Sequence, residues 1–305
     1  MKTTLRMYFL TINDVKLLRE LSFRPLTVNQ ASVSLGVTPG LSSRVIHNLE
    51  SKGFVSVIRK GSSKEVRLSK HLHAQYFSDL IKKEPFVAWE KVLSYSKLGA
   101  LMRSMGFFPD MNFSRTTDWR ITRDIGALAQ PNYRNSSLKE FLRVYADYIT
   151  RDFASKKFPP YAALVWNRGF RYLIRVPAGK GMTGNLIPTA ISVFPHFGIS
   201  LVTEYDYYFY NPSHDVLSVE DYIVHTLLID PGSTIYITYA ILLLLRSVKL
   251  INRVRLMQTA NDYSVTSSIQ AMIDYIDTKG RKRSSNLPPY EELLEKAALY
   301  GVKAN

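Results

Sequence analysis

Residues 27–69 read TVNQASVSLGVTPGLSSRVIHNLESKGFVSVIRKGSSKEVRLS, and this stretch decides the fold of the first part of the chain. Its first apolar positions recur at helical spacing as far as Gly36, a residue type that commonly ends helices. A further helix is predicted over 40–52, because Thr38 is a good N-terminal cap and Pro39 suits the first helical position. Two helices joined by a short glycine-containing turn predict a helix-turn-helix.

A β-hairpin is predicted directly after these helices. Apolar and polar residues alternate over 54–59 and again over 64–68, and the turn-forming residues 60–63 separate the two runs. A capped amphipathic helix over 11–21 precedes the quoted stretch. Three helices followed by a hairpin predict a winged helix-turn-helix over residues 1–69.

The helix over 40–52 is expected to have an apolar side that packs inward, which includes Leu41, and a polar side that faces outward. An α-helix fits the major groove of DNA, where hydroxyl, guanidinium and imidazole groups contact base edges or phosphates. A basic hairpin gains affinity along the phosphate backbone through counterion release. The residues expected to contact DNA are Thr38, Ser42, Ser43, Arg44 and His47 at the helix, and Arg59, Lys60, Lys64 and Arg67 in the hairpin.

The same residues resemble the winged-helix domain of MarR- and ArsR-type regulators. The likeness lies in the Thr-Pro pair at 38–39, in Ser-Ser-Arg at 42–44, in LESKGFV at 49–55 and in the glycine turn of the hairpin. The Gly-Leu pair at 40–41 departs from the pattern, because small hydroxyl residues are commoner there. The resemblance implies a transcriptional regulator that binds double-stranded DNA sequence-specifically. We also expect a homodimer, since one recognition helix provides little specificity.

The charge distribution agrees with a polyanion-binding part joined to a part with another task. The chain carries a formal net charge of +15, and residues 1–180 hold 30 Lys and Arg against 13 Asp and Glu, a net of +17. Residues 181–305 hold 10 against 12, a net of −2. Such asymmetry indicates contact with DNA, RNA or an anionic membrane surface. The helix and hairpin pattern favours DNA among these.

Composition excludes several other classes of protein. A chain of 305 residues is long enough for two or three domains. The absence of cysteine excludes a disulfide scaffold, a zinc-thiolate site and a cysteine nucleophile. The longest apolar run, 235–245, is far shorter than the roughly 20 residues of a membrane span. The N-terminus also lacks the pattern of a signal peptide, so we expect a cytoplasmic protein with no membrane contact.

Residues 70–158 are predicted to form a helical linker region, with helices over 69–83, 86–105 and 136–154. Between the last two of these helices, residues 114–126 resemble the helix over 40–52: hydroxyl residues precede arginines, apolar residues recur at helical spacing, and a glycine ends the stretch. Two interpretations are open: a second, degenerate winged helix over 97–130, or a basic helix on a connecting bundle.

Residues 159–305 are predicted to form an α+β domain, so the whole chain is expected to belong to the α+β class. A hairpin is predicted first, with its turn at 167–169, and apolar helical stretches follow later in the domain. The predicted strands or strand–helix segments cover 162–166, 170–176, 187–194 and 200–210, and the predicted helices cover 219–229, 235–248 and 290–300.

The order of this domain resembles the nucleotidyltransferase-like domains that follow winged helices in many archaeal regulators and in abortive-infection antitoxins of the AbiEi type. The likeness lies in 198–210 and 217–228. Nucleotidyl transfer requires carboxylates that hold Mg²⁺ against a triphosphate, and Glu204 and Asp206 have the spacing of one strand face. The family's Gly-Ser turn does not precede them. We therefore expect a degenerate, non-enzymatic domain with no catalytic residue, no metal site and no cofactor.

The leading interpretation is a DNA-binding regulator whose C-terminal domain provides ligand, partner-protein or dimer contacts. An antitoxin-like protein that binds a partner through this domain is one alternative. A nucleotidyltransferase-type enzyme is the other, with Glu204, Asp206 and a third carboxylate around Mg²⁺. His225 lies in an apolar helical run and is expected to be a core residue rather than a ligand.

Overall fold

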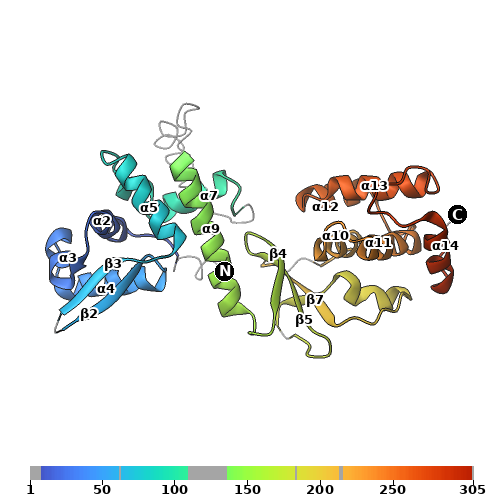
Figure 1. The fold of residues 1–305 in the computed structure, drawn as a ribbon, viewed down its shortest axis with the longest axis horizontal. Coiled ribbons are helices and arrows are strands. Elements are labelled where there is room, and N and C mark those ends of the chain that lie inside the picture. The colour runs from blue at the N-terminus through green and yellow to red at the C-terminus, as the bar shows by residue number, and fades with distance from the viewer. Residues whose placement is uncertain (1–7, 62, 109–135, 183, 213–215, 304–305) are drawn as a thin grey trace. The chain divides into compact units, whose positions relative to one another are not determined.

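The computed structural model describes residues 8–61, 63–108, 136–182, 184–212 and 216–303 (Figure 1). The chain divides into two compact units, Met1–Ala154 and Ser155–Asn305, which we call the first and second units. Each unit combines helices with one small antiparallel sheet, so the predicted α+β class is confirmed. None of the helices in the described ranges has both the length and the apolar character that crossing a membrane requires.

The N-terminal part of the first unit contains three helices and a three-stranded sheet. These elements are α2 (Ile12–Leu21), β1 (Leu26–Thr27), α3 (Val28–Leu35), α4 (Pro39–Ser51), β2 (Val55–Lys60) and β3 (Ser63–Leu68). The central strand is β3, which pairs antiparallel with β1 on one side and with β2 on the other. The three predicted helices and the predicted hairpin are present, and the two residues before α3 form a short strand.

Local capping explains where these helices begin and end. At α2, the Thr11 hydroxyl accepts a hydrogen bond from the Asp14 N–H, and the Asp14 carboxylate accepts one from the Thr11 N–H. At α4, the Thr38 hydroxyl accepts a hydrogen bond of 3.4 Å from the Leu41 N–H. Gly36 ends α3 at a φ of 65°, a left-handed conformation that suits glycine. These caps fix the short turn between α3 and α4.

Further helices in the first unit are α5 (Leu72–Lys83), α6 (Trp89–Val92), α7 (Tyr95–Ser104) and α9 (Ser136–Lys157). Phe54, which follows α4, connects them to the N-terminal elements: its ring centroid lies 6.1 Å from that of Phe77 in α5 and 4.9 Å from that of Tyr145 in α9. This aromatic packing joins α5 and α9 to the N-terminal segment within the first unit.

The helices predicted over 69–83, 86–105 and 136–154 are present in α5, in α6 with α7, and in α9. Most of the segment proposed for a second winged helix, 97–130, coincides with residues 109–135, which lie outside the described residues.

The second unit is built on a four-stranded antiparallel sheet in the order β4-β5-β7-β6. Its strands are β4 (Ala163–Arg168), β5 (Arg171–Pro177), β6 (Leu186–Pro188) and β7 (Tyr205–Tyr210). The predicted first hairpin is present as β4 and β5. The stretch 200–210 is a strand only from Tyr205, and the stretch 187–194 divides between β6 and a 3₁₀ helix, η2 (Ala190–Phe197).

Five α-helices follow the sheet in the described part of the second unit. They are α10 (Val219–Ile229), α11 (Thr234–Arg246), α12 (Arg253–Asp262), α13 (Thr266–Asp277) and α14 (Tyr290–Leu299). Within this unit, α10 and α11 lie between the sheet with η2 and the pair α12–α13 (Figure 1). The predicted helices α10, α11 and α14 are present, and α12 and α13 are additional. The middle of α10 and the middle of α11 supply much of the core, with Ile223, Val224, Leu227 and Leu228 from α10 and Ala240, Ile241, Leu242 and Leu243 from α11 all buried.

Candidate nucleic-acid interface

The outward face of α4 carries most of the helix residues expected to contact DNA. Thr38, Ser43, Arg44 and His47 are all exposed. The side chain of His47 is 85% exposed, and its only ion-pair partner among the described residues is the Glu50 carboxylate at 4.0 Å. Arg44 forms no ion pair with any described residue. The face therefore presents a guanidinium, an imidazole and two hydroxyl groups to solvent, although the Thr38 hydroxyl is occupied as the helix cap.

Two residues of α4 face the opposite way from the prediction. Ser42 is fully buried, and its hydroxyl donates a 3.5 Å hydrogen bond to the Val28 carbonyl of α3, so its assignment as a DNA contact is wrong. Leu41, expected to pack inward, is 41% exposed. The reason is the helical period: Ser42 shares the inward stripe of Val45, Ile46 and Leu49, which are its neighbours at positions i+3, i+4 and i+7.

The β2–β3 hairpin presents two exposed basic side chains from adjacent strands. Arg59 of β2 and Lys64 of β3 are directly opposite each other in the antiparallel register, and both are exposed. The backbone of Lys60 belongs to β2 and pairs with Ser63, and its side chain lies outside the described part of the structure. The tip of the hairpin therefore carries a local concentration of positive charge.

Arg67 differs from these residues, because an acidic neighbour on the same strand neutralises it. Its guanidinium lies 2.6 Å from the Glu65 carboxylate, and the two side chains are 41% and 19% exposed. Residues two apart on a strand share a face, which explains the pairing. Arg67 is consequently a weaker candidate for a phosphate contact than Arg59 or Lys64.

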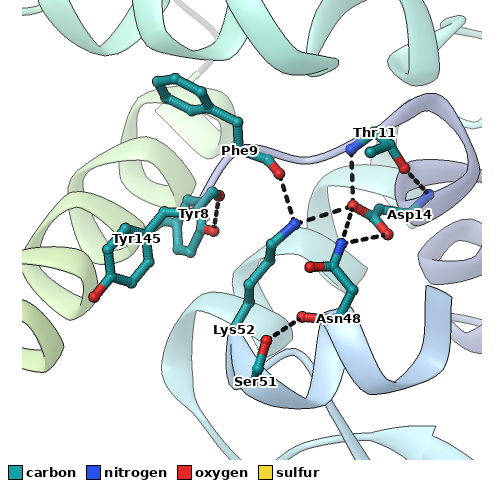
Figure 2. A network of polar contacts seen from close by, with 8 residues as sticks. All are labelled: Tyr8, Phe9, Thr11, Asp14, Asn48, Ser51, Lys52 and Tyr145. Atoms are coloured by element: carbon teal, nitrogen blue, oxygen red, sulfur yellow. Dashed lines mark hydrogen bonds and ion pairs between the residues drawn. The ribbon is translucent and has the colours of Figure 1, made fainter. Parts of the chain in front are cut away.

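A buried ion pair fixes the C-terminal end of α4 against the start of α2 (Figure 2). The Lys52 ammonium lies 3.1 Å from the Asp14 carboxylate and donates a 2.6 Å hydrogen bond to the Phe9 carbonyl. The two charged side chains are only 2% and 1% exposed. Burial lowers the pKa of the Lys52 ammonium, and the Asp14 carboxylate acts in the opposite direction. Lys52 is therefore a structural cation and not part of the DNA-facing charge.

The Asp14 carboxylate has further partners besides Lys52. The Asn48 amide donates to both of its oxygens, at 3.2 and 3.0 Å, and the Thr11 N–H donates at 2.8 Å. One buried carboxylate thus caps α2 and contacts two residues near the end of α4 (Figure 2). This network could not be predicted from the sequence, because the pattern of polar and apolar residues does not distinguish Asp14 and Lys52 from exposed polar residues.

A residue of α5 holds the same end of α4, and residues of α9 hold the neighbouring segment at Tyr8. The Nε2 of His73 in α5 lies 3.1 Å from the Lys52 carbonyl, so it is the protonated nitrogen and donates to that oxygen. His73 is 1% exposed, and its burial lowers the pKa to about 4. The Tyr145 hydroxyl of α9 donates to the Tyr8 carbonyl, and the Tyr8 hydroxyl donates to the Asp152 carboxylate of α9 at 2.6 Å. The C-terminal end of the candidate recognition helix is therefore anchored to α2, to α5 and to the segment 8–9, which α9 holds in turn.

The carboxylates considered for metal chemistry lie in the second unit. Glu204 is exposed just before β7, and the Asp206 carboxylate accepts a 3.1 Å hydrogen bond from the Gly179 N–H. Among the described residues, no three His, Cys, Asp or Glu side chains gather in a way that could hold a metal ion. His225 is fully buried in the core, as predicted, with its Nδ1 2.8 Å from the Thr189 hydroxyl and the pKa lowered by burial to about 3.

Comparison with known proteins gives one match. A family model described as HVO_2833_C, C-terminal, matches residues 184–302, which lie within the second unit and run from β6 through α14. No curated protein and no solved structure matches the chain.

Proposed function

We propose that the protein is a sequence-specific, double-stranded DNA-binding transcriptional regulator, and that residues 1–69 of its first unit act as a winged helix-turn-helix. The observation that carries the proposal is the shared exposure of Ser43, Arg44 and His47 on α4 with Arg59 and Lys64 on the hairpin. All five side chains are polar or basic, and the network around Lys52 holds the helix that carries three of them.

Each group has a defined role in the proposal. The Arg44 fork donates to the O6 and N7 atoms of guanine, and Ser43 and His47 contact neighbouring base edges or phosphates in the major groove. Arg59 and Lys64 contact the phosphate backbone, where they release counterions and contribute affinity without sequence preference. Lys60 is also expected to contact the phosphate backbone, because it follows Arg59 at the end of β2.

Two copies of the chain bind one operator in this proposal, because two-fold sites double the sequence that a single recognition helix reads. The second unit, in which residues 181–305 carry a net charge of −2, provides the contacts to a ligand, a partner protein or a second copy. The protein acts in the cytoplasm, where its DNA is located.

Selection of bound sequences from random double-stranded DNA, followed by fluorescence anisotropy titration at several salt concentrations, tests the proposal. We expect a defined enriched sequence, bound at least about 10³-fold more tightly than a scrambled duplex. A double-stranded RNA of the enriched sequence is the matched control, because the deep and narrow major groove of A-form RNA does not admit an α-helix. No enrichment, or equal affinity for the RNA, would contradict the proposal.

A further inference from the structure

The second unit contains a cavity of about 450 Å³ beside the N-terminal end of β7 and the start of α11. Its lining comes from β5, η2, the segment 201–204, β7, the connection 230–233 between α10 and α11, and the first turns of α11. Small-molecule sites in proteins have volumes of about 300–1,000 Å³ and combine aromatic walls with a few polar groups. The cavity has the size of such a site, and the composition of its lining identifies the class of ligand.

Tyrosines form much of the wall: Tyr205 and Tyr207 from β7, and Tyr236 and Tyr239 from α11. The hydroxyls of Tyr207 and Tyr236 are 3.4 Å apart. Burial raises the pKa of the Tyr207 hydroxyl, so this group stays neutral at physiological pH. Neutral tyrosine rings attract cations over their faces, and their oxygens accept hydrogen bonds from ammonium groups.

The charges of the lining also favour a cation. Glu204 and Asp230 both line the cavity, and neither side chain forms an ion pair with any residue in the described ranges. The one lining arginine, Arg175, is already positioned over an aromatic ring, with its guanidinium carbon 4.5 Å from the Tyr205 centroid. Two carboxylates against one guanidinium leave the lining with a net negative charge, and the Arg175–Tyr205 contact shows that a ring of this wall accepts a cation.

We propose that this cavity binds a small organic cation that carries an ammonium group, with Glu204 and Asp230 as its counter-ions and the tyrosine rings as its walls. The ammonium donates hydrogen bonds to the carboxylates, and its alkyl part packs against the rings. All lining residues of this cavity belong to the second unit, whereas the proposed DNA contacts belong to the first. A test of cation binding is therefore independent of a test of DNA binding.

A matched ligand series tests the charge preference directly. Butylammonium, butanol and butyrate each contain four carbons and carry a positive, a neutral and a negative polar group, and each is titrated into the full chain by saturation-transfer NMR at constant ionic strength. We expect saturable binding of butylammonium, and binding of butanol and butyrate that is weaker by about tenfold or more. Equal binding of the three compounds, no saturable binding of butylammonium, or a preference for butyrate that Arg175→Gln abolishes would each overturn the proposal.

Variants then locate the site. The double variant Glu204→Gln and Asp230→Asn is expected to weaken butylammonium binding by about tenfold. Both residues are exposed, so the fold is expected to persist, and thermal unfolding of the variant checks this. The control is Glu295→Gln, which removes an exposed carboxylate on α14 outside the cavity. Equal weakening by the control, or undiminished binding by the double variant, would show that butylammonium does not bind here.

Discussion

The exposed guanidinium of Arg44 is the single group on which sequence recognition is expected to depend most. Its removal in Arg44→Ala should weaken binding to the selected sequence by about 1–3 kcal/mol and relax the preference at one base position, since a bidentate contact to guanine is lost. Anisotropy titrations of the selected duplex and of single-base variants at fixed salt measure both effects. Arg143→Ala, which removes an exposed arginine from α9, is the control. Unchanged affinity and unchanged preference would contradict the assignment.

The buried Lys52–Asp14 pair should matter for stability far more than its exposed counterparts. Replacement of Lys52 by Ala leaves the Asp14 carboxylate buried without a counter-ion, so we expect the free energy of unfolding to fall by about 3–5 kcal/mol. Urea unfolding followed by circular dichroism measures this change. Lys296→Ala is the matched control, because its pair with Glu292 lies at the surface, and a loss of at most about 1 kcal/mol is expected. Similar losses in both variants would contradict the structural role of Lys52.

His73 should make the first unit sensitive to acid. Its pKa is about 4 in the folded state and near 6.5 when unfolded, so the unfolded state binds more protons between these values. Stability is therefore expected to fall as the pH decreases through this window, by about 2 kcal/mol from about pH 7.5 to about pH 5. Urea unfolding at the two pH values measures the loss. His225 adds a similar dependence in the second unit, with a folded pKa of about 3.

The variant His73→Gln separates the two histidines. Glutamine keeps a hydrogen-bond donor for the Lys52 carbonyl but does not titrate, so the acid sensitivity of the first unit should be greatly reduced. If His73→Gln lost the same free energy of unfolding at low pH as the unsubstituted protein, groups other than His73 would cause the acid sensitivity.

At the scale of elements, the β2–β3 hairpin should contribute affinity without specificity. Lys64→Ala removes one exposed cation next to Arg59, so binding should weaken about equally for all DNA sequences. The slope of log affinity against log salt concentration should decrease by about one. Titrations of the selected and scrambled duplexes over a salt series measure both quantities. A loss confined to the selected duplex would mean that Lys64 reads bases instead.

Most elements could be predicted from the sequence because their ends carry strong local signals. Thr11, Thr38 and Gly36 delimit helices through capping and a positive φ, and these interactions are formed within a few residues. Helix α13 was not predicted, although Ile269, Met272 and Ile273 stand at helical spacing and are buried. Helix α12 was not predicted because it buries only Leu256 and Ala260 and has a weak apolar stripe. Its position depends on packing against α10 and α13, which a local pattern does not contain.

Part of the candidate interface could be predicted from the sequence, because local periodicity determines which side of a helix or strand a residue occupies. The exposure of Arg44, His47, Arg59 and Lys64 follows from helix and strand periodicity. Ser42 is polar, and for that reason it was predicted to be exposed. Its spacing from the apolar residues of α4 places it on the buried side of the helix instead.

At the scale of the whole molecule, the net charge overstates the positive surface that can contact DNA. Residues 1–180 carry a net of +17, but several of their cations already have anionic partners. Lys52 is buried against Asp14, Arg67 pairs with Glu65, and Arg151 pairs with Asp147. Counting charges along the sequence locates the excess of positive charge in residues 1–180. Which of these cations are paired follows only from the contacts between side chains in the folded protein.

The stoichiometry of the complex tests the proposed dimer. If two copies bind one operator, selected sequences should contain two inverted half-sites about 34–36 Å apart, which is one helical turn of DNA. Sedimentation of the complex should then give two chains per duplex. A duplex with one half-site deleted is the control, and should bind one chain with most of the specific affinity lost, because the second recognition helix has no target. A single chain bound to an asymmetric site with full affinity would contradict the dimer and would leave the roles of Arg44 and Lys64 intact.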